Sequence, residues 1–128
     1  MESVVLDSSA VIAFHNPYDV HHASIVAAIG QSQARFTIST VTVMESLVAC
    51  ARVSERVTAQ MLADLTTCYG PFLVMDTEVA LIASRLRAKG ALSTPDSIIS
   101  ASATNAGAAL WTFDSRLAKA HKGARLLS

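Results

Sequence analysis

Residues 4–13 read Val-Val-Leu-Asp-Ser-Ser-Ala-Val-Ile-Ala, and the rest of the chain is best understood from this segment. Its first three residues, Val4 to Leu6, form an apolar run typical of a central strand that is covered on both faces. Asp7 follows directly, so a carboxylate lies at the carboxyl end of this strand. In parallel α/β proteins that end of the sheet is where ligands bind. Asp7 could instead serve only as the N-cap of a following helix, which is a common role of aspartate.

Strand-like and helix-like segments alternate along the rest of the chain. We expect a loop at 14–18, and Thr94 as an N-cap with Pro95 at the first helical position. The alternation predicts parallel βαβ units with right-handed crossovers, and hence a three-layer α/β/α sandwich around a central parallel sheet of four to five strands. Further strands are expected at 36–39, 72–75, 109–112 and 124–127, and helices at 19–29, 40–52, 54–69, 77–89, 94–106 and after Asp114.

The glycines argue against a nucleotide-binding fold. Each of the five follows a predicted helix, where a left-handed residue commonly ends the helix. No glycine is left for a phosphate-binding loop, and neither Gly-x-Gly-x-x-Gly nor Gly-x-x-x-x-Gly-Lys occurs. Folds of the dinucleotide-binding and P-loop types are therefore excluded.

Length and composition predict one soluble domain spanning residues 1–128. The chain is 52% hydrophobic and 16% charged, which excludes a disordered protein, and no apolar run approaches the ~18 residues of a membrane span. The N-terminus has no basic segment of the kind that precedes a secretion signal, so we expect a cytoplasmic protein. Cys50 and Cys68 are far apart and are expected to be free thiols.

The net charge of zero hides an uneven distribution. Beyond residue 79 the acids are Asp96 and Asp114 alone, among many basic residues. Such charges could form a solvated face or a rim that contacts phosphates, and the sequence leaves both readings open. The basic residues of this region are Arg85, Arg87, Lys89, Arg116, Lys119, Lys122 and Arg125.

Four carboxylates share one property of position: each is expected at the carboxyl end of a strand or in the first turn of the helix that follows. Because parallel strands end at the same edge of a sheet, the four should lie close together. Each has an ordinary alternative role: a capping box of Glu45 with Thr42, or a favourable charge at a helix N-terminus. The four residues are Asp7, Glu45, Asp96 and Asp114.

A cluster of carboxylates needs a compensating charge. Two of them ~5 Å apart repel by roughly 3 kcal/mol at an effective dielectric constant of 20, more than capping offsets. Hard divalent cations such as Mg²⁺ or Mn²⁺ prefer oxygen ligands and are the natural partners. Such a cation activates water and stabilises charge on a phosphodiester that is being cleaved, so the protein need supply no nucleophile of its own.

Other chemistries have weaker support. His21 and His22 are adjacent and cannot both face one zinc site from a helix, and His15 lies apart from them. Ser8 and Ser9 lack the Gly-x-Ser-x-Gly context of a nucleophile. We expect these serines, and Thr112, to bind the carboxylates through hydrogen bonds.

Four motifs in order resemble a PIN domain. They are the segment 4–13, Glu45 in Val-Met-Glu-Ser, Thr-Pro-Asp-Ser-Ile-Ile-Ser-Ala-Ser-Ala at 94–103, and Thr-Phe-Asp-Ser-Arg-Leu at 112–117. In length and motif order the chain is similar to the VapC toxins, the ribonucleases of VapBC toxin–antitoxin pairs. The resemblance covers nearly the whole chain.

The resemblance implies a sheet with strand order 3-2-1-4-5 and Mg²⁺-dependent endonucleolytic cleavage of RNA. Asp7 and Asp96 would be the main metal ligands, completed by Glu45 and Asp114, with Thr112 beside the pocket. It further implies a homodimer, larger assemblies with a VapB-type antitoxin, and an antitoxin tail that covers the acidic groove. Some relatives carry another acid shortly after the Asp114 position, where this chain has Ser115, Arg116 and Leu117.

RNA contacts are expected from basic residues near the acids. Phosphate contacts set affinity without reading sequence. We consider Arg85, Arg87, Arg116 and Lys119 for this role.

Two other functions fit parts of the pattern. A receiver-like regulatory domain would be phosphorylated on aspartate, but it requires adjacent acids after the first strand, where Asp7 stands alone, and a phosphoacceptor where Asp76 is expected to cap a helix. A PIN-like scaffold could bind a partner without catalysis, although all four acids are present.

Overall fold

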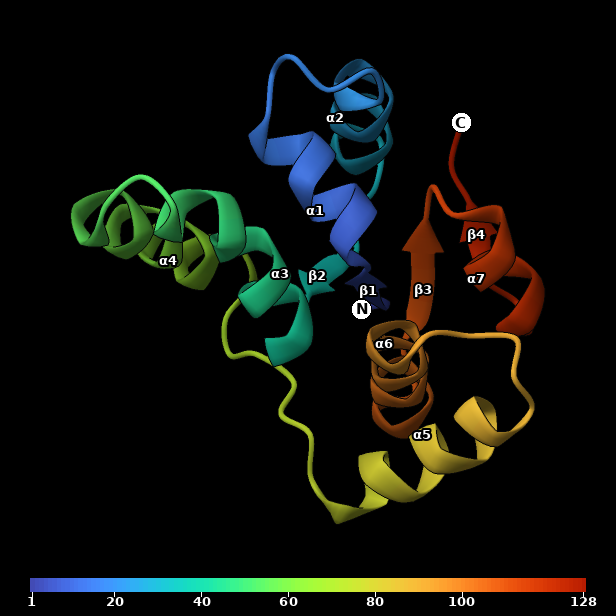
Figure 1. Ribbon diagram of the computed structural model, residues 1–128. Coiled ribbons are helices and arrows are strands. Elements are labelled where there is room, and N and C mark those ends of the chain that lie inside the picture. The colour runs from blue at the N-terminus through green and yellow to red at the C-terminus, as the bar shows by residue number, and fades with distance from the viewer.

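The computed structural model describes residues 1–128, and its centre is a parallel sheet of order β2-β1-β3-β4 with helices on both faces (Figure 1). β1 pairs with β2 on one side and with β3 on the other, and β4 pairs with β3 at the edge. The α/β/α class predicted from the sequence is confirmed. The elements are β1 (Ser3–Leu6), α1 (Ser8–His15), α2 (His22–Gly30), β2 (Arg35–Thr37), α3 (Thr40–Ala51), α4 (Glu55–Tyr69), α5 (Thr77–Ala88), α6 (Thr94–Ala106), β3 (Ala109–Thr112), α7 (Ser115–Ala120) and β4 (Arg125–Leu126).

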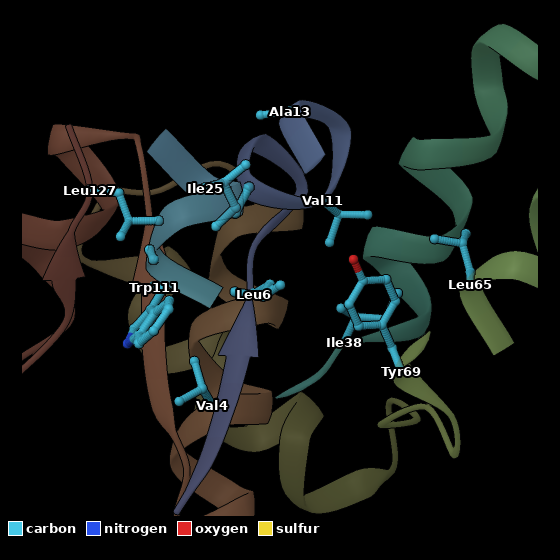
Figure 2. Packing of buried hydrophobic residues seen from close by; sticks show 12 residues of the cluster. Val4, Leu6, Val11, Ala13, Ile25, Ile38, Leu65, Tyr69, Trp111 and Leu127 are labelled. Atoms are coloured by element: carbon cyan, nitrogen blue, oxygen red, sulfur yellow. The ribbon is translucent and has the colours of Figure 1, made fainter. Parts of the chain in front are cut away.

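The side chains of β1 alternate between two cores. Val4 and Leu6 pack with Trp111 of β3 against α1, α2 and α4, as Figure 2 shows, while Val5 packs with α6 and α7 on the opposite face. All three β1 side chains are fully buried. The strand is therefore covered on both faces, as the apolar run at 4–6 predicted.

The segment 72–75 forms no full strand, contrary to the sequence prediction. It makes a single parallel bridge between Leu73 and Ser39, just beyond the end of β2. Its position next to β2 matches the predicted order 3-2-1-4-5, while the regular sheet stops at four strands. Val74 and Met75 are exposed, so little burial is available to extend the pairing.

Several predicted helix ends are shifted. α1 continues to His15, into the predicted loop. Asp19 accepts a hydrogen bond from His21 N in the preceding turn, and the next helix begins at His22 rather than at 19. The N-cap of α6 is Ser93, one residue before the predicted Thr94.

Two of the glycines do not end helices in the left-handed conformation. Gly107 has φ +63°, as predicted for a helix C-cap, and Gly90 and Gly123 also have positive φ. Gly30 is instead the last residue of α2, and Gly70 has φ −69°. Gly70 is needed for another reason: a Cβ atom there would lie 2.7 Å from the backbone oxygen of Thr66.

None of the helices combines the length and the apolar character that crossing a membrane requires. Cys50 and Cys68 are free thiols, as predicted.

Candidate active site

Asp7 lies at the carboxyl end of β1 and is only 3% exposed. Its Oδ1 accepts hydrogen bonds from Ser9 Oγ at 2.7 Å and from Ala10 N at 3.0 Å, and its Oδ2 accepts one from Thr112 Oγ1. It is thus the N-cap of α1, and the capping role weighed from the sequence is real. Capping alone does not account for a carboxylate held by two hydroxyls in a buried site.

Burial raises the pKa of Asp7, the hydroxyls of Thr112 and Ser9 and the Ala10 N–H lower it, and the charge of Asp96 raises it; the net direction is upward. The protein therefore keeps this carboxylate where its charge is unfavourable. Perturbed groups of this kind concentrate at functional sites.

Glu45 reaches the same region from α3. It lies in the second turn of the helix, because α3 begins at Thr40, and the predicted first-turn position was wrong. Its Oε1 accepts a hydrogen bond from Ser8 Oγ at 2.5 Å, in place of the capping box with Thr42. Thr42 is fully buried and lies 3.3 Å from the same serine hydroxyl.

Asp96 and Asp114 begin the two helices that follow in the chain. Asp96 lies in the first turn of α6, and Asp114 is the N-cap of α7, accepting from Arg116 N at 2.8 Å. Burial has the largest effect on the pKa of Asp96 and raises it, and the negative charges of Asp114 and Glu45 raise it further. The Ser93 hydroxyl and the charge of Arg116 lower this pKa, but the net direction is upward.

The four carboxylates are therefore electrostatic neighbours. Asp96 is the common member, because it raises the pKa of Asp7 and its own pKa is raised by Glu45 and Asp114. No three Asp, Glu, His or Cys side chains are arranged to hold a metal ion as they stand.

The donor set nevertheless suits a hard cation. Glu45 Oε2 and Asp114 Oδ2 accept no hydrogen bond within the chain, whereas the oxygens of Asp7 are held by hydroxyls and an N–H. All candidate ligands are oxygens, the atoms that Mg²⁺ and Mn²⁺ prefer. On this chemistry the residues fit a divalent cation.

The serines and the threonine expected to bind the carboxylates through hydrogen bonds do so. Thr112 Oγ1 binds Asp7 and also accepts from Asp114 N at 2.9 Å, so one buried hydroxyl links Asp7 to the backbone of Asp114. Ser9 joins Asp7 to Phe113 N at 3.1 Å. Thr42 beside Ser8 was missed, since its burial depends on how α3 packs against α1.

The basic candidates are exposed and lie on two helices. Arg116 and Lys119 are on α7, and Arg116 is close enough to Asp96 to lower its pKa. Arg85 and Arg87 are in the last turn of α5, where Arg87 borders a hollow shared with Thr94 of α6.

His15 and His22 each bind a group of the chain through a ring nitrogen. His15 pairs with Tyr69 OH at 2.9 Å, and His22 pairs with the Ala13 carbonyl at 2.8 Å. His21 stacks on Phe113.

An apolar cavity of about 250 Å³ lies between α1, α3 and α4. Glu45 lines it together with Ser46, whose Oγ is buried without a hydrogen-bond partner. Its apolar lining is formed by Val11, Ile12, Ala49, Cys50, Met61 and Leu65.

A family profile described as "PIN domain" matches residues 4–123. Comparison of the sequence with curated proteins gives no match. The profile covers every candidate residue named above.

Solved structures with the same fold include toxins and toxin–antitoxin complexes. VapC20 of Mycobacterium tuberculosis, described as a sarcin-ricin loop cleaving toxin, aligns with a TM-score of 0.79 and 16% identity over 98% of this chain and 99% of that one. A toxin–antitoxin complex from Klebsiella pneumoniae gives 0.77 and 20% over 94% of each chain. DNA-bound VapBC from Salmonella typhimurium gives 0.69 and 24% over 98% and 97%. At these identities the likeness shows a shared fold.

Proposed function

Because the chain belongs to the PIN domain family, we propose that it is a Mg²⁺- or Mn²⁺-dependent endoribonuclease and the toxin of a toxin–antitoxin pair. The observation that carries the proposal is a set of hydrogen bonds: Thr112 and Ser9 join Asp7 to the backbone around Asp114, and Ser8, next to Asp7, binds Glu45. The charge of Asp96 adds to this group, since it raises the pKa of Asp7. Acids placed in this way cost stability unless a cation joins them. The VapC20 and VapBC structures of the same fold add support from outside the chain.

Asp7 and Asp96 would be the principal ligands of the cation, with Glu45 and Asp114 completing the site. A divalent cation supplies Lewis acidity: it acidifies water and offsets charge that develops on a phosphodiester. Ser9 and Thr112 fix the Asp7 carboxylate, and Ser8 fixes that of Glu45. The protein residues thus orient the acids and need supply no nucleophile of their own.

RNA is the proposed substrate, held through its phosphates by Arg85, Arg87, Arg116 and Lys119. These side chains are exposed, and Arg116 lies beside the acids. Lys and Arg contacts of this kind fix the register of the backbone and make binding salt-dependent. We expect the enzyme to act in the cytoplasm.

The proposed protein partner is a VapB-type antitoxin. The apolar cavity between α1, α3 and α4 has Glu45 at its lining, so a partner segment seated there would also cover the acidic site. A homodimer that assembles further with the antitoxin is part of the same proposal.

The first experiment tests the nuclease with a matched pair of variants. Asp7→Asn keeps a helix-capping side chain but removes the charge, and RNA cleavage should fall at least about 100-fold, as losses of electrostatic stabilisation commonly do. Asp76→Asn is the control, because Asp76 caps α5 through Val79 N at 2.9 Å in the same way. Cleavage of total RNA, with EDTA as a second control, is the measurement. Full activity of Asp7→Asn, or of the wild type in EDTA, would refute the mechanism.

The receiver alternative is less favoured because Asp76, its only candidate phosphoacceptor near the third strand position, is engaged as the α5 cap. A stable acyl-phosphate after incubation with a small phosphodonor would revive it. A non-catalytic scaffold would show metal binding that is equal in the wild type and Asp96→Ala.

A further inference from the structure

The loop between α1 and α2 contacts the loop that carries the candidate site. The His21 ring stacks on Phe113 with a centroid distance of 4.2 Å and an angle of 13° between the planes. Phe113 lies between Thr112 and Asp114, and its N–H donates to Ser9 Oγ, the same hydroxyl that binds Asp7. The stacked pair is therefore linked to Asp7 through Ser9, and Phe113 is the neighbour of Asp114 in the chain.

His21 differs from the other histidines. Each of the others binds a group of the chain through a ring nitrogen, namely Tyr69 OH, the Ala13 carbonyl and Ser100 Oγ. The ring of His21 makes no such bond, and the residue is half-exposed. Its ring instead stacks on the ring of Phe113, and Phe113 packs against the core. The imidazole of His21 is thus partly exposed and lies flat against Phe113, a residue that the core holds in place.

The aromatic side chains of the chain differ in how exposed they are. Trp111 and Tyr69 are buried, and all four phenylalanines, Phe113 included, pack against the core. Tyr18, in the same loop as His21, is 96% exposed. The most exposed ring of the chain, that of Tyr18, therefore lies in the α1–α2 loop together with His21.

The loop is held in shape before any ligand arrives. Tyr18 N donates to Asn16 Oδ1 at 3.0 Å, and His21 N donates to Asp19 Oδ1 at 2.8 Å. A preordered ring loses little conformational freedom when a ligand stacks on it, which favours binding.

We propose that His21, supported by Phe113, stacks against an unpaired nucleobase of single-stranded RNA beside the acidic site, with Tyr18 as a second ring. The proposal rests on the proposed function for its ligand class. Unstacked bases of RNA loops and single strands are commonly bound on aromatic or histidine rings, and stacking accepts every base because each has a π face. A site of this kind selects unpaired RNA over a duplex.

The test measures binding in a protein that does not cleave. In the Asp7→Asn background with Mg²⁺, calorimetry gives the affinity for a short single-stranded RNA of mixed sequence and for an RNA of the same length without bases. His21→Ala should weaken binding of the base-bearing RNA about fivefold or more, and His21→Phe, which keeps a ring, should retain the affinity. Val53→Ala is the control, since Val53 is 72% exposed in the α3–α4 turn. The RNA without bases should bind the His21→Ala protein and its parent equally.

Unchanged binding of the base-bearing RNA by His21→Ala would overturn the stacking role. The role would also be overturned if His21→Ala lost affinity for the RNA without bases as well, and if His21→Phe did not restore that affinity. Such a result would indicate a phosphate contact. If His21→Ala does not fold, the ring protons of His21 in the Asp7→Asn protein decide by NMR: they should shift upfield with the base-bearing RNA alone. The failure of the nuclease proposal is distinguishable from this result: it would appear as wild-type protein that leaves RNA intact, whereas binding through His21 is measured without cleavage.

Discussion

Thr112 is the residue that most directly couples the sheet to the acids. Its buried hydroxyl donates to Asp7 Oδ2 and accepts from Asp114 N, so it links the ends of β1 and α7. One side-chain oxygen thereby holds the carboxylate of Asp7 and the backbone N–H of Asp114, two residues that are far apart in sequence. A methyl group in the same place could do neither.

Thr112→Val is therefore expected to act on both stability and activity. Leaving Asp114 N and Asp7 Oδ2 without this partner should lower the free energy of unfolding by about 1–3 kcal/mol. Because the hydroxyl lowers the pKa of Asp7, its loss should raise that pKa further and move the acid limb of the activity profile to higher pH. Chemical denaturation and pH–rate profiles measure the two effects. Thr112→Ser should restore both, and a profile identical to wild type in Thr112→Val would contradict the role.

At the scale of an element, the backbone conformation at a helix end decides whether a glycine there can be replaced. Gly107 has φ +63°, and an alanine there is strained whatever the space around it. Gly30 is helical, and nothing lies within 4 Å of a Cβ built on it. We expect Gly107→Ala to destabilise by about 1 kcal/mol and Gly30→Ala to stabilise by up to about 1 kcal/mol, since alanine is the better helix former. Thermal melts of the two variants should therefore shift in opposite directions; equal shifts would show that the backbone conformation is not the cause.

α6 and α7 are joined through one buried polar contact. Ser100 Oγ, on a residue that is 1% exposed, lies 2.6 Å from His121 Nδ1 at the end of α7. Since Asp96 lies in the first turn of α6 and Asp114 is the N-cap of α7, the contact helps to set the spacing of these two acids. Ser102 of the same helix bonds only to the carbonyl of Ile98 and provides a comparison.

The pH dependence of stability should report the burial of His121. Burial lowers the pKa of His121 from 6.5, so the unfolded chain binds more protons than the folded one near and below that value. The contribution of His121 is therefore complete above its unfolded pKa and is lost as the pH falls through 6.5 toward the lowered value. His15 behaves in the same direction, while Asp7 and Asp96, whose pKa values are raised, act in the opposite direction. His121→Gln should hence show a flatter loss of stability on acidification than the wild type, measured by urea unfolding across this range. Identical slopes would exclude His121 as a source.

At the scale of the whole molecule, the parallel sheet explains how much the sequence alone could predict. Asp7 and Asp114 follow strands that the hydrophobic pattern identifies, and a parallel sheet brings such positions to one edge. Glu45 was placed correctly at the edge but in the wrong turn, because the N-cap of α3 is Ser39. The single bridge at Leu73 and the stack of His21 on Phe113 depend on tertiary packing, which no local pattern encodes.

The acid cluster also predicts how the whole fold responds to metal. Without a divalent cation, Asp96→Asn should be more stable than the wild type near neutral pH, because it removes a charge that burial, Asp114 and Glu45 make unfavourable. With Mg²⁺ at about ten times its dissociation constant, the wild type should gain about 1.4 kcal/mol, whereas the variant should gain less because it has lost a ligand. The difference in melting temperature between the two proteins should therefore shrink or reverse on adding Mg²⁺ and return in EDTA. Asp76→Asn, which changes a cap away from the cluster, should follow the wild type in both conditions. Equal Mg²⁺ shifts in all three proteins would mean that these acids do not bind the ion together.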